Sequence, residues 1–258
     1  MADGQRQLRI AAVGDIHFDG NRTGELRELF SDIQRSADVL VLCGDLTTHG
    51  RPDQMRAVID ELAGVSVPVV AVLGNHDFEQ DEDEACTALL QEAGVQVLDG
   101  TSTVIEGVGF AGTKGFAGGF GRGALGPFGE ALIKDFVNAA VDEALKLERA
   151  LQELSTESRI VVLHYAPIPD TLAGEPEVIF PFLGSSRLLQ PIETLGADAV
   201  FHGHAHHGIL EARTPSGIPV FNVALPVLRE RGLNFQTITV PAPDRRSDRE
   251  PATGSPAD

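Results

Sequence analysis

The stretch LRIAAVGDIH at residues 8–17 sets the pattern of the first third of the chain. A short apolar run ends in Gly and Asp, and an amphipathic segment follows it. The pattern returns as DVLVLCGD at 38–45 and as VPVVAVLGNHD at 67–77. Apolar runs of this length, rich in Val, Leu and Ile, are typical of strands buried on both faces, and the segments between them have helical spacing. The alternation of strand and helix predicts an α/β fold with a parallel sheet.

The rest of the chain continues this pattern after one change. Short alternating runs at 95–112 predict hairpins, and a Gly-rich stretch at 112–129 predicts a loop before a long helix at 130–153. The spacing predicts a further helix capped near Ser185 or Ser186. Further strands are expected at 159–167, 197–208, 208–213, 218–223 and 233–240.

The chain reads as a single domain over residues 1–240. No linker interrupts it, and 258 residues with 42% hydrophobic and 22% charged side chains suit one globular domain. The polar segment 241–258 has no apolar period, which predicts a disordered C-terminal tail.

Charge and composition limit the partners and the compartment. The net charge of −18 would repel a nucleic-acid backbone, so a dedicated nucleic-acid binder is disfavoured. Nowhere do about eighteen consecutive apolar residues occur, so no membrane span is expected. The two cysteines have no CxxC spacing, and the first residues lack a signal-peptide pattern, which together predict a cytoplasmic protein.

Every strong buried-strand candidate ends in a side chain that can bind a metal. Ligands of open α/β sheets bind beyond the carboxyl ends of the strands, so these side chains are expected to converge on one crevice. A single histidine at such a place is more often a packing or capping residue, and it is the convergence that favours a site. The strand-end residues are Asp15, His17, Asp45, Asn75, His76, His164, His204 and His206.

The types of these side chains indicate the metal. Carboxylates, imidazoles and an amide oxygen, with neither cysteine at a strand end, suit Mn, Fe, Zn or Co rather than a thiolate zinc site or an all-oxygen calcium site. The number of side chains exceeds what one ion needs. Two ions that share one Asp would form the clamp used to hydrolyse phosphate esters.

In their order, these motifs resemble the five-motif signature of calcineurin-like metallophosphoesterases. The matching residues are GDIH at 14–17, GD at 44–45, GNHD at 74–77, His164 and GHAH at 203–206. The resemblance implies a four-layer α/β sandwich, in which two mixed sheets pack together and helices flank them. It also implies one ion held by Asp15, His17, Asp45 and His206, and a second held by Asp45, Asn75, His164 and His204.

The resemblance further implies how catalysis would work. Asp45 would bridge the ions, His76 would protonate the leaving oxygen or stabilise the phosphoryl group, and Asp77 would orient the His76 imidazole. The expected function is hydrolysis of a phosphodiester or phosphomonoester of a small molecule by a metal-bridging hydroxide, which metals make available near neutral pH. The alternatives are a nuclease with the same site, disfavoured by the lack of a basic stripe, and a catalytically silent scaffold, disfavoured because no ligand is missing.

Four residues outside the signature are weaker candidates. Lys114 and Arg122 lie in the Gly-rich stretch, where a cover over the site would place basic groups against the substrate phosphate, although a structural loop is an open alternative. His49 would face substrate or be a plain turn residue. His202 is expected behind the metal site rather than on a metal, because it shares a strand face with His204.

Overall fold

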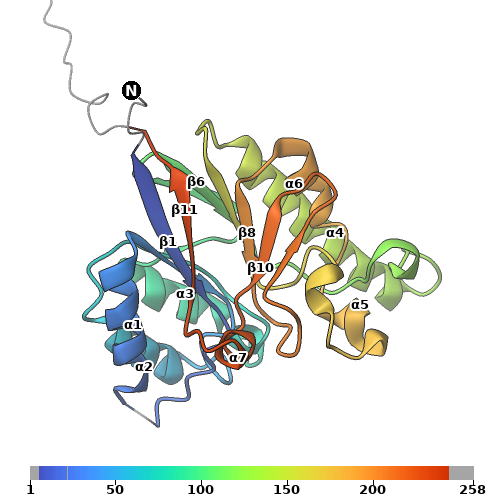
Figure 1. The fold of residues 1–258 in the computed structure, drawn as a ribbon. Coiled ribbons are helices and arrows are strands. Elements are labelled where there is room, and N and C mark those ends of the chain that lie inside the picture. The colour runs from blue at the N-terminus through green and yellow to red at the C-terminus, as the bar shows by residue number, and fades with distance from the viewer. Residues whose placement is uncertain (1–5, 22, 244–258) are drawn as a thin grey trace, which may run out of the picture.

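The computed structural model describes residues 6–21 and 23–243 as two β-sheets packed face to face with helices on both outer faces (Figure 1). The strands are β1 (Gln7–Val13), β2 (Val39–Cys43), β3 (Val69–Val72), β4 (Gln96–Val97), β5 (Thr101–Ile105), β6 (Val108–Gly112), β7 (Arg159–Val162), β8 (Ala199–His202), β9 (Glu211–Arg213), β10 (Pro219–Asn222) and β11 (Gln236–Pro241). The α-helices are α1 (Glu25–Ser36), α2 (Pro52–Leu62), α3 (Asp83–Glu92), α4 (Ala131–Gln152), α5 (Phe180–Leu183), α6 (Leu189–Leu195) and α7 (Leu225–Glu230). The short 3-10 helices are η1 (His76–Phe78), η2 (Gly121–Gly123), η3 (Asp170–Leu172) and η4 (Glu177–Ile179).

Both sheets are mixed. The first has five strands in the order β11-β1-β2-β3-β4, and the second has six in the order β5-β6-β7-β8-β10-β9. The central strands β1, β2 and β3 are parallel, as are β6, β7 and β8, while β11, β5 and β9 are antiparallel edge strands. The four-layer sandwich expected from the motifs is confirmed.

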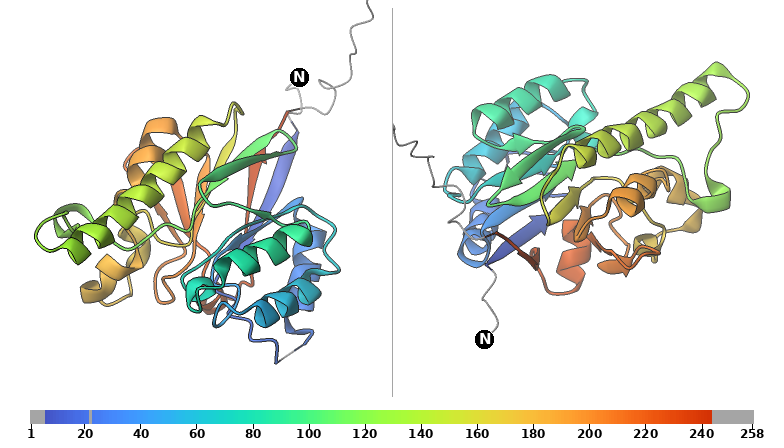
Figure 2. Two further views of the ribbon diagram at one scale, coloured as in Figure 1. Left: turned by 180° about the vertical axis from the view of Figure 1, so that it is seen from behind. Right: turned by 90° about the horizontal axis from the view of Figure 1, so that it is seen from above.

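Helices cover the outer face of each sheet, as Figure 2 shows from behind and from above. α1 has an apolar stripe with Leu26, Phe30 and Ile33 buried, and it lies with α2 and α3 on the first sheet. α4 and α6 cover the second sheet. The main core cluster includes Phe110 and Phe201 of the second sheet along with residues of the first, so apolar burial between the sheets holds the sandwich together.

Most predicted elements lie where the sequence places them. The helix predicted at 130–153 is α4, and the three short C-terminal strands are β9, β10 and β11. The cap near Ser185 or Ser186 is wrong: α6 begins at Leu189 without a side-chain cap, and Ser185 Oγ accepts a hydrogen bond from the Arg187 amide instead.

The described part of the chain ends just after β11. This strand runs to Pro241, and Ala242 is buried, just past the predicted domain boundary. Residues 244–258 of the predicted tail lie outside the described residues. Within the described part of the chain, no helix has the length and apolar character needed to cross a membrane.

Candidate metal centre

The carboxyl ends of strands from both sheets meet at one edge of the sandwich. β1 and β2 are parallel neighbours, and Asp15 and Asp45 follow them at equivalent places. The turn after β1 is bound to the turn after β2, since the Asp15 amide donates to Gly44 O at 2.9 Å and the His17 amide donates to Asp45 O at 3.0 Å. Parallel pairing thus brings two carboxylates to one crevice.

The crevice assembles the seven ligands that the signature implies. Three groups of side chains have potential ligand atoms within 4.8 Å of one another. Asn75 joins the third of them, because its Oδ1 lies 2.8 Å from His164 Nε2. The groups are Asp15, His17 and His206; His17, Asp45 and His76; and Asp45, His164 and His204.

Asp45 faces two groups of ligands at once. Its Oδ2 lies 3.7 Å from His17 Nε2, and its Oδ1 lies 3.4 Å from His164 Nε2. On the first side, His206 Nε2 is 3.0 Å from Asp15 Oδ1. The carboxylate of Asp45 therefore has one oxygen toward each half of the site.

Backbone contacts hold one ring nitrogen of His164 and of His204 and leave the other nitrogen available to a metal. His164 Nδ1 donates to Cys43 O at 2.9 Å, so its Nε2 keeps the lone pair on the side of Asp45. His204 Nε2 lies 3.2 Å from Phe182 O, and a bond donated there leaves Nδ1 for a metal. Such bonds from the far nitrogen fix the tautomer of metal-binding histidines.

The electrostatics of the site suit cations. Asp15 and Asp45 are almost fully buried. Burial lowers the pKa of His17 to about 4 and that of His204 to about 3, so these rings are neutral at physiological pH. His206 differs, because its hydrogen bond to Asp15 raises its pKa. Two buried carboxylates beside the neutral rings of His17 and His204 favour a bound cation.

One buried nitrogen in the described part of the chain makes no hydrogen bond. Among the described residues, His17 Nε2 is the buried side-chain nitrogen or oxygen that makes no hydrogen bond. An unpartnered imidazole nitrogen beside Asp45 is what a metal ligand requires. The donors present therefore fit divalent metal ions.

Left-handed backbone conformations concentrate in the site. Of the six described non-glycine residues with positive φ, four are Asp15, His17, Asp45 and His204, with φ between 42° and 69°. Residues with β-carbons adopt this region only when their surroundings hold them there. The turns after the strands are shaped to aim these side chains into the crevice.

Two glycines of the motifs make room for the carboxylates. A Cβ on Gly74 would lie 2.1 Å from Asp45 Oδ1, and a Cβ on Gly203 would lie 2.2 Å from Asp15 Oδ2. Both contacts are far shorter than van der Waals distance. The glycine before Asn75 and the glycine before His204 are therefore part of the site.

We expect Gly74→Ala to disrupt the metal site, because the new methyl group would displace the Asp45 carboxylate. Metal content measured by elemental analysis should fall, and the midpoint of thermal unfolding should drop by several degrees, as for a strained buried site that loses about 1 to 3 kcal/mol. Gly64→Ala is the matched control, since a Cβ there meets nothing within 4 Å. Equal metal content in the two variants would show that the close approach at Gly74 is unimportant.

His76 lies at the open side of the crevice. Its side chain is 40% exposed, its Nδ1 donates to Thr48 O at 2.9 Å, and its ring centroid is 4.7 Å from that of His17. The backbone amide of His76 donates to Asp45 Oδ1 at 2.8 Å. The imidazole is held at one nitrogen and presents the other to the site.

The role predicted for Asp77 is wrong. The buried carboxylate does not hold the His76 imidazole, which Thr48 O positions instead. It accepts hydrogen bonds from the amides of Leu46, Thr47 and Gly74, and from the Thr47 hydroxyl at 2.7 Å. Asp77 therefore ties the loop after β2 to the loop after β3 and fixes Asp45 rather than His76.

The weaker candidates are dispersed. His49 is exposed, and its Nδ1 lies 3.1 Å from Glu79 Oε2, which is 3.7 Å from His76 Nδ1. Lys114 is half-buried beside the site, and Arg122 is exposed on η2. Contacts of His49, Lys114 and Arg122 with substrate remain predictions. His202 is buried away from the ligands, with Nδ1 bonded to Gly203 O and Nε2 2.8 Å from Thr171 Oγ1, as expected.

Sequence reasoning does not single out Tyr165, which lies at the site. Its ring centroid lies 4.5 Å from that of His204 and 5.5 Å from that of His164. Its position directly after His164 is the signal that could have found it.

Comparisons with known proteins identify the family of the chain. The family model for calcineurin-like phosphoesterases matches residues 8–208, which contain all five motifs. A probable cyclic nucleotide phosphodiesterase of Rhodococcus erythropolis is 25% identical over 241 residues, covering 88% of this chain and 70% of that protein. One of Vesicomyosocius okutanii is 25% identical over 214 residues, covering 76% of this chain and 78% of that protein.

Solved structures share the fold at lower identity. The phosphopantetheinyl hydrolase of Mycobacterium tuberculosis superposes with a TM-score of 0.62 at 16% identity, over 89% of this chain and 95% of that one. The protein TT1561 of Thermus thermophilus gives a TM-score of 0.55 at 16% identity, over 90% of this chain and 99% of that one. With its motifs, its four-layer fold and its crevice of metal-competent side chains, the chain belongs to the calcineurin-like phosphoesterase family and is a phosphoric ester hydrolase.

Proposed function

We propose that the protein hydrolyses a phosphodiester of a small molecule with the help of two divalent metal ions. The observation that carries the proposal is Asp45, whose two oxygens face separate groups of ligands. Asp15, His17 and His206 would hold one ion with Asp45, and Asn75, His164 and His204 would hold the other with it. Bound together, such ions supply an activated water and a clamp on the phosphate oxygens.

The protein's own residues have separate tasks in this proposal. His76 donates a proton to the departing oxygen, because its second ring nitrogen faces the open side of the crevice and imidazole is a common general acid. Thr48 O keeps the ring in place. Asp77 and the glycines of the motifs hold the ligands in position.

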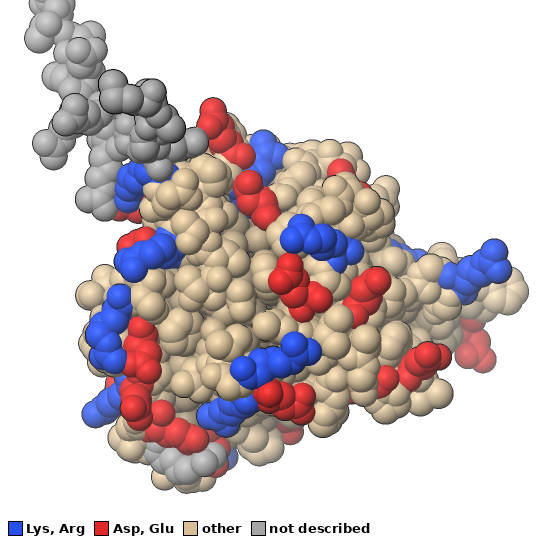
Figure 3. Space-filling model, in the orientation of Figure 1, with Lys and Arg blue, Asp and Glu red and all other residues tan. Residues whose placement is uncertain are grey.

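A phosphodiester is favoured over other substrates by the relatives, which are named probable cyclic nucleotide phosphodiesterases. We extend that class to this chain as a proposal. The nuclease alternative has less support: the net charge is −18, and Figure 3 shows basic and acidic side chains interspersed on the visible face. No observation favours a scaffold, because every expected ligand is present in the crevice.

A substrate panel tests the proposal. Protein loaded with manganese, iron or zinc is assayed on 4-nitrophenyl phosphate, bis(4-nitrophenyl) phosphate, cyclic nucleotides and single-stranded DNA. We expect the small diesters to have the highest kcat/KM. A preference for the monoester or for DNA would overturn the assignment of substrate class.

A further inference from the structure

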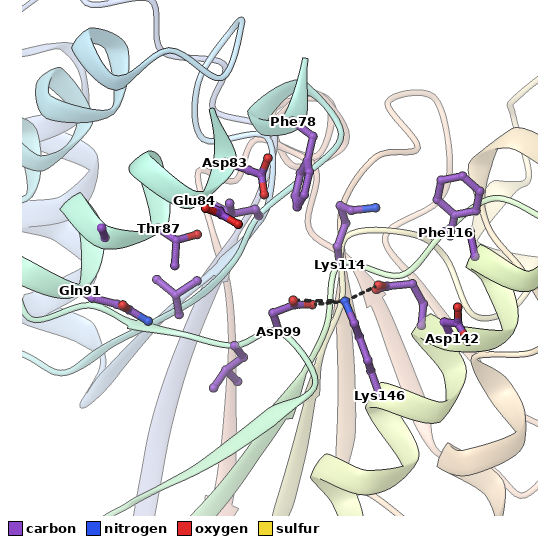
Figure 4. A pocket seen from close by; sticks show the side chains of 16 residues that line it. Phe78, Asp83, Glu84, Thr87, Gln91, Asp99, Lys114, Phe116, Asp142 and Lys146 are labelled. Atoms are coloured by element: carbon purple, nitrogen blue, oxygen red, sulfur yellow. Dashed lines mark hydrogen bonds and ion pairs between the residues drawn. The ribbon is translucent and has the colours of Figure 1, made fainter. Parts of the chain in front are cut away.

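A cavity of about 690 Å³ lies between α3 and α4, next to the metal centre but outside its ligands (Figure 4). Small-molecule sites are usually about 300 to 1,000 Å³ in volume. α3 packs on the first sheet and α4 packs on the second. The cavity therefore opens where the two halves of the sandwich meet. Nothing in the proposed metal chemistry uses it.

Two residues connect the cavity to the catalytic residues. Phe78 lines the cavity and belongs to η1, the same short helix that carries His76. The carbonyl of Lys114 accepts hydrogen bonds from the amides of His164 and Tyr165 at 3.0 and 3.1 Å. A group bound at the Phe78 end of the cavity would therefore lie beside the phosphate site.

The Lys114 ammonium uses only part of its hydrogen-bonding capacity within the protein. It donates to Gly115 O at 3.1 Å and lies 5.0, 5.1 and 5.4 Å from the ring centroids of Phe78, Phe116 and Tyr165. Among the described residues, no carboxylate forms an ion pair with it. Lysine has three donors, so Lys114 can also bind an acceptor on a ligand.

The other lysine of the cavity is already neutralised. Lys146 Nζ lies 2.8 Å from both Asp99 Oδ1 and Glu143 Oε1, as the dashed lines in Figure 4 show. Glu143 also accepts from the Gly115 amide at 2.8 Å. This network fixes the floor of the cavity and leaves Lys114 as the cation that faces a ligand.

The remaining walls combine apolar surface with hydrogen-bond acceptors. Phe78 and Phe116 stand on either side of Lys114 in Figure 4, and stacking on aromatic rings favours flat heterocycles. Thr87 and Gln91 offer polar contacts on α3. Carboxylates at the rim suit hydroxyl and amino groups and would repel a second anionic group. These carboxylates are Asp83, Glu84 and Asp142.

We propose that this cavity binds the nucleoside portion of the substrate, with the ring near Phe78 and Phe116 and one acceptor on Lys114. The inference rests on the proposed function, because it assumes that the phosphate is bound at the adjacent metal centre. It names the substrate class as esters of nucleosides rather than of simple alcohols or polyanions.

Variants that fill the cavity test the inference. Ala139→Trp on α4 and Ala88→Trp on α3 project a large side chain into it from opposite sides. Ala144→Trp is the matched control, because Ala144 is on the same helix as Ala139 and equally half-buried but lines a different cavity. The substrates are thymidine 5′-(4-nitrophenyl phosphate) and methyl 4-nitrophenyl phosphate, which both release nitrophenolate.

We expect the two cavity variants to lower kcat/KM for the thymidine ester by about tenfold or more, chiefly through KM, and to leave the methyl ester within about twofold of wild type. The control variant should leave both substrates within about twofold. Equal losses on both esters, or none on either, would overturn the inference.

A binding measurement separates this inference from the proposed function. Thymidine is titrated into wild-type protein and into each variant, and heat or ligand-observed NMR signals are followed. If thymidine binding is lost in the two cavity variants but not in the control, the inference is supported, even if neither ester is hydrolysed. In that case only the proposed function fails. Binding that is equal in Ala139→Trp and Ala144→Trp, or noncompetitive inhibition by thymidine, would refute it.

Discussion

Asp45→Ala is expected to reduce bound metal from about two ions per chain to less than one and to lower kcat/KM by more than about 100-fold. The carboxylate lies between two groups of ligands, 3.4 Å from His164 Nε2 and 3.7 Å from His17 Nε2. Its removal takes a ligand from both ions. Loss of an outer partner of a ligand already costs about 10- to 100-fold in metal affinity or activity, so loss of a shared ligand should cost more.

Elemental analysis and the substrate panel measure both effects, and thermal unfolding checks that the variant folds. Asp60→Ala is the control, since this exposed carboxylate on α2 lies outside the site. If Asp45→Ala kept full metal occupancy, the shared-ligand assignment would be wrong.

His76→Ala is expected to keep its metal and its fold but to lower kcat by about 10²- to 10⁴-fold, the range for a positioned general acid. The loss should be smaller with a nitrophenolate leaving group, which departs without a proton. This difference between leaving groups distinguishes proton donation from a general weakening of the site. His207→Ala, which removes an exposed histidine next to the ligand His206, is the control.

The position of His76 allows a second outcome. One of its ring nitrogens lies within 4.8 Å of potential ligand atoms of His17 and Asp45. If His76→Ala lost metal as Asp45→Ala does, His76 would be a ligand and the proton donor would have to be sought elsewhere.

The sequence was sufficient to predict the sheets, and which side chains gather at their carboxyl edge, because strand ends are local signals. An apolar run followed by Gly and a polar residue marks the end of a buried strand. The polar side chain at that strand end is expected to point into the crevice at the carboxyl edge of the sheet. Parallel pairing then brings Asp15 beside Asp45, although their positions in the sequence are far apart. The same logic brings His164 and His204 close to Asp45, as the structure shows.

Features that depend on contacts between distant loops were beyond sequence reasoning. The resemblance assigns Asp77 to the neighbouring imidazole of His76. In the structure its carboxylate instead accepts hydrogen bonds from the amides of Leu46 and Thr47. The start of α6 at Leu189 likewise follows from packing rather than from a capping serine. The cavity between α3 and α4 combines residues of both halves of the sandwich, and no local pattern indicates that they meet.

The most direct test of the account is the metal content of the wild-type protein, measured together with its diesterase activity before and after treatment with a chelator. The account predicts about two transition-metal ions per chain, loss of activity on their removal, and recovery when manganese, iron or zinc is restored. One ion per chain at full activity, or hydrolysis that continues after complete removal of metal, would contradict it.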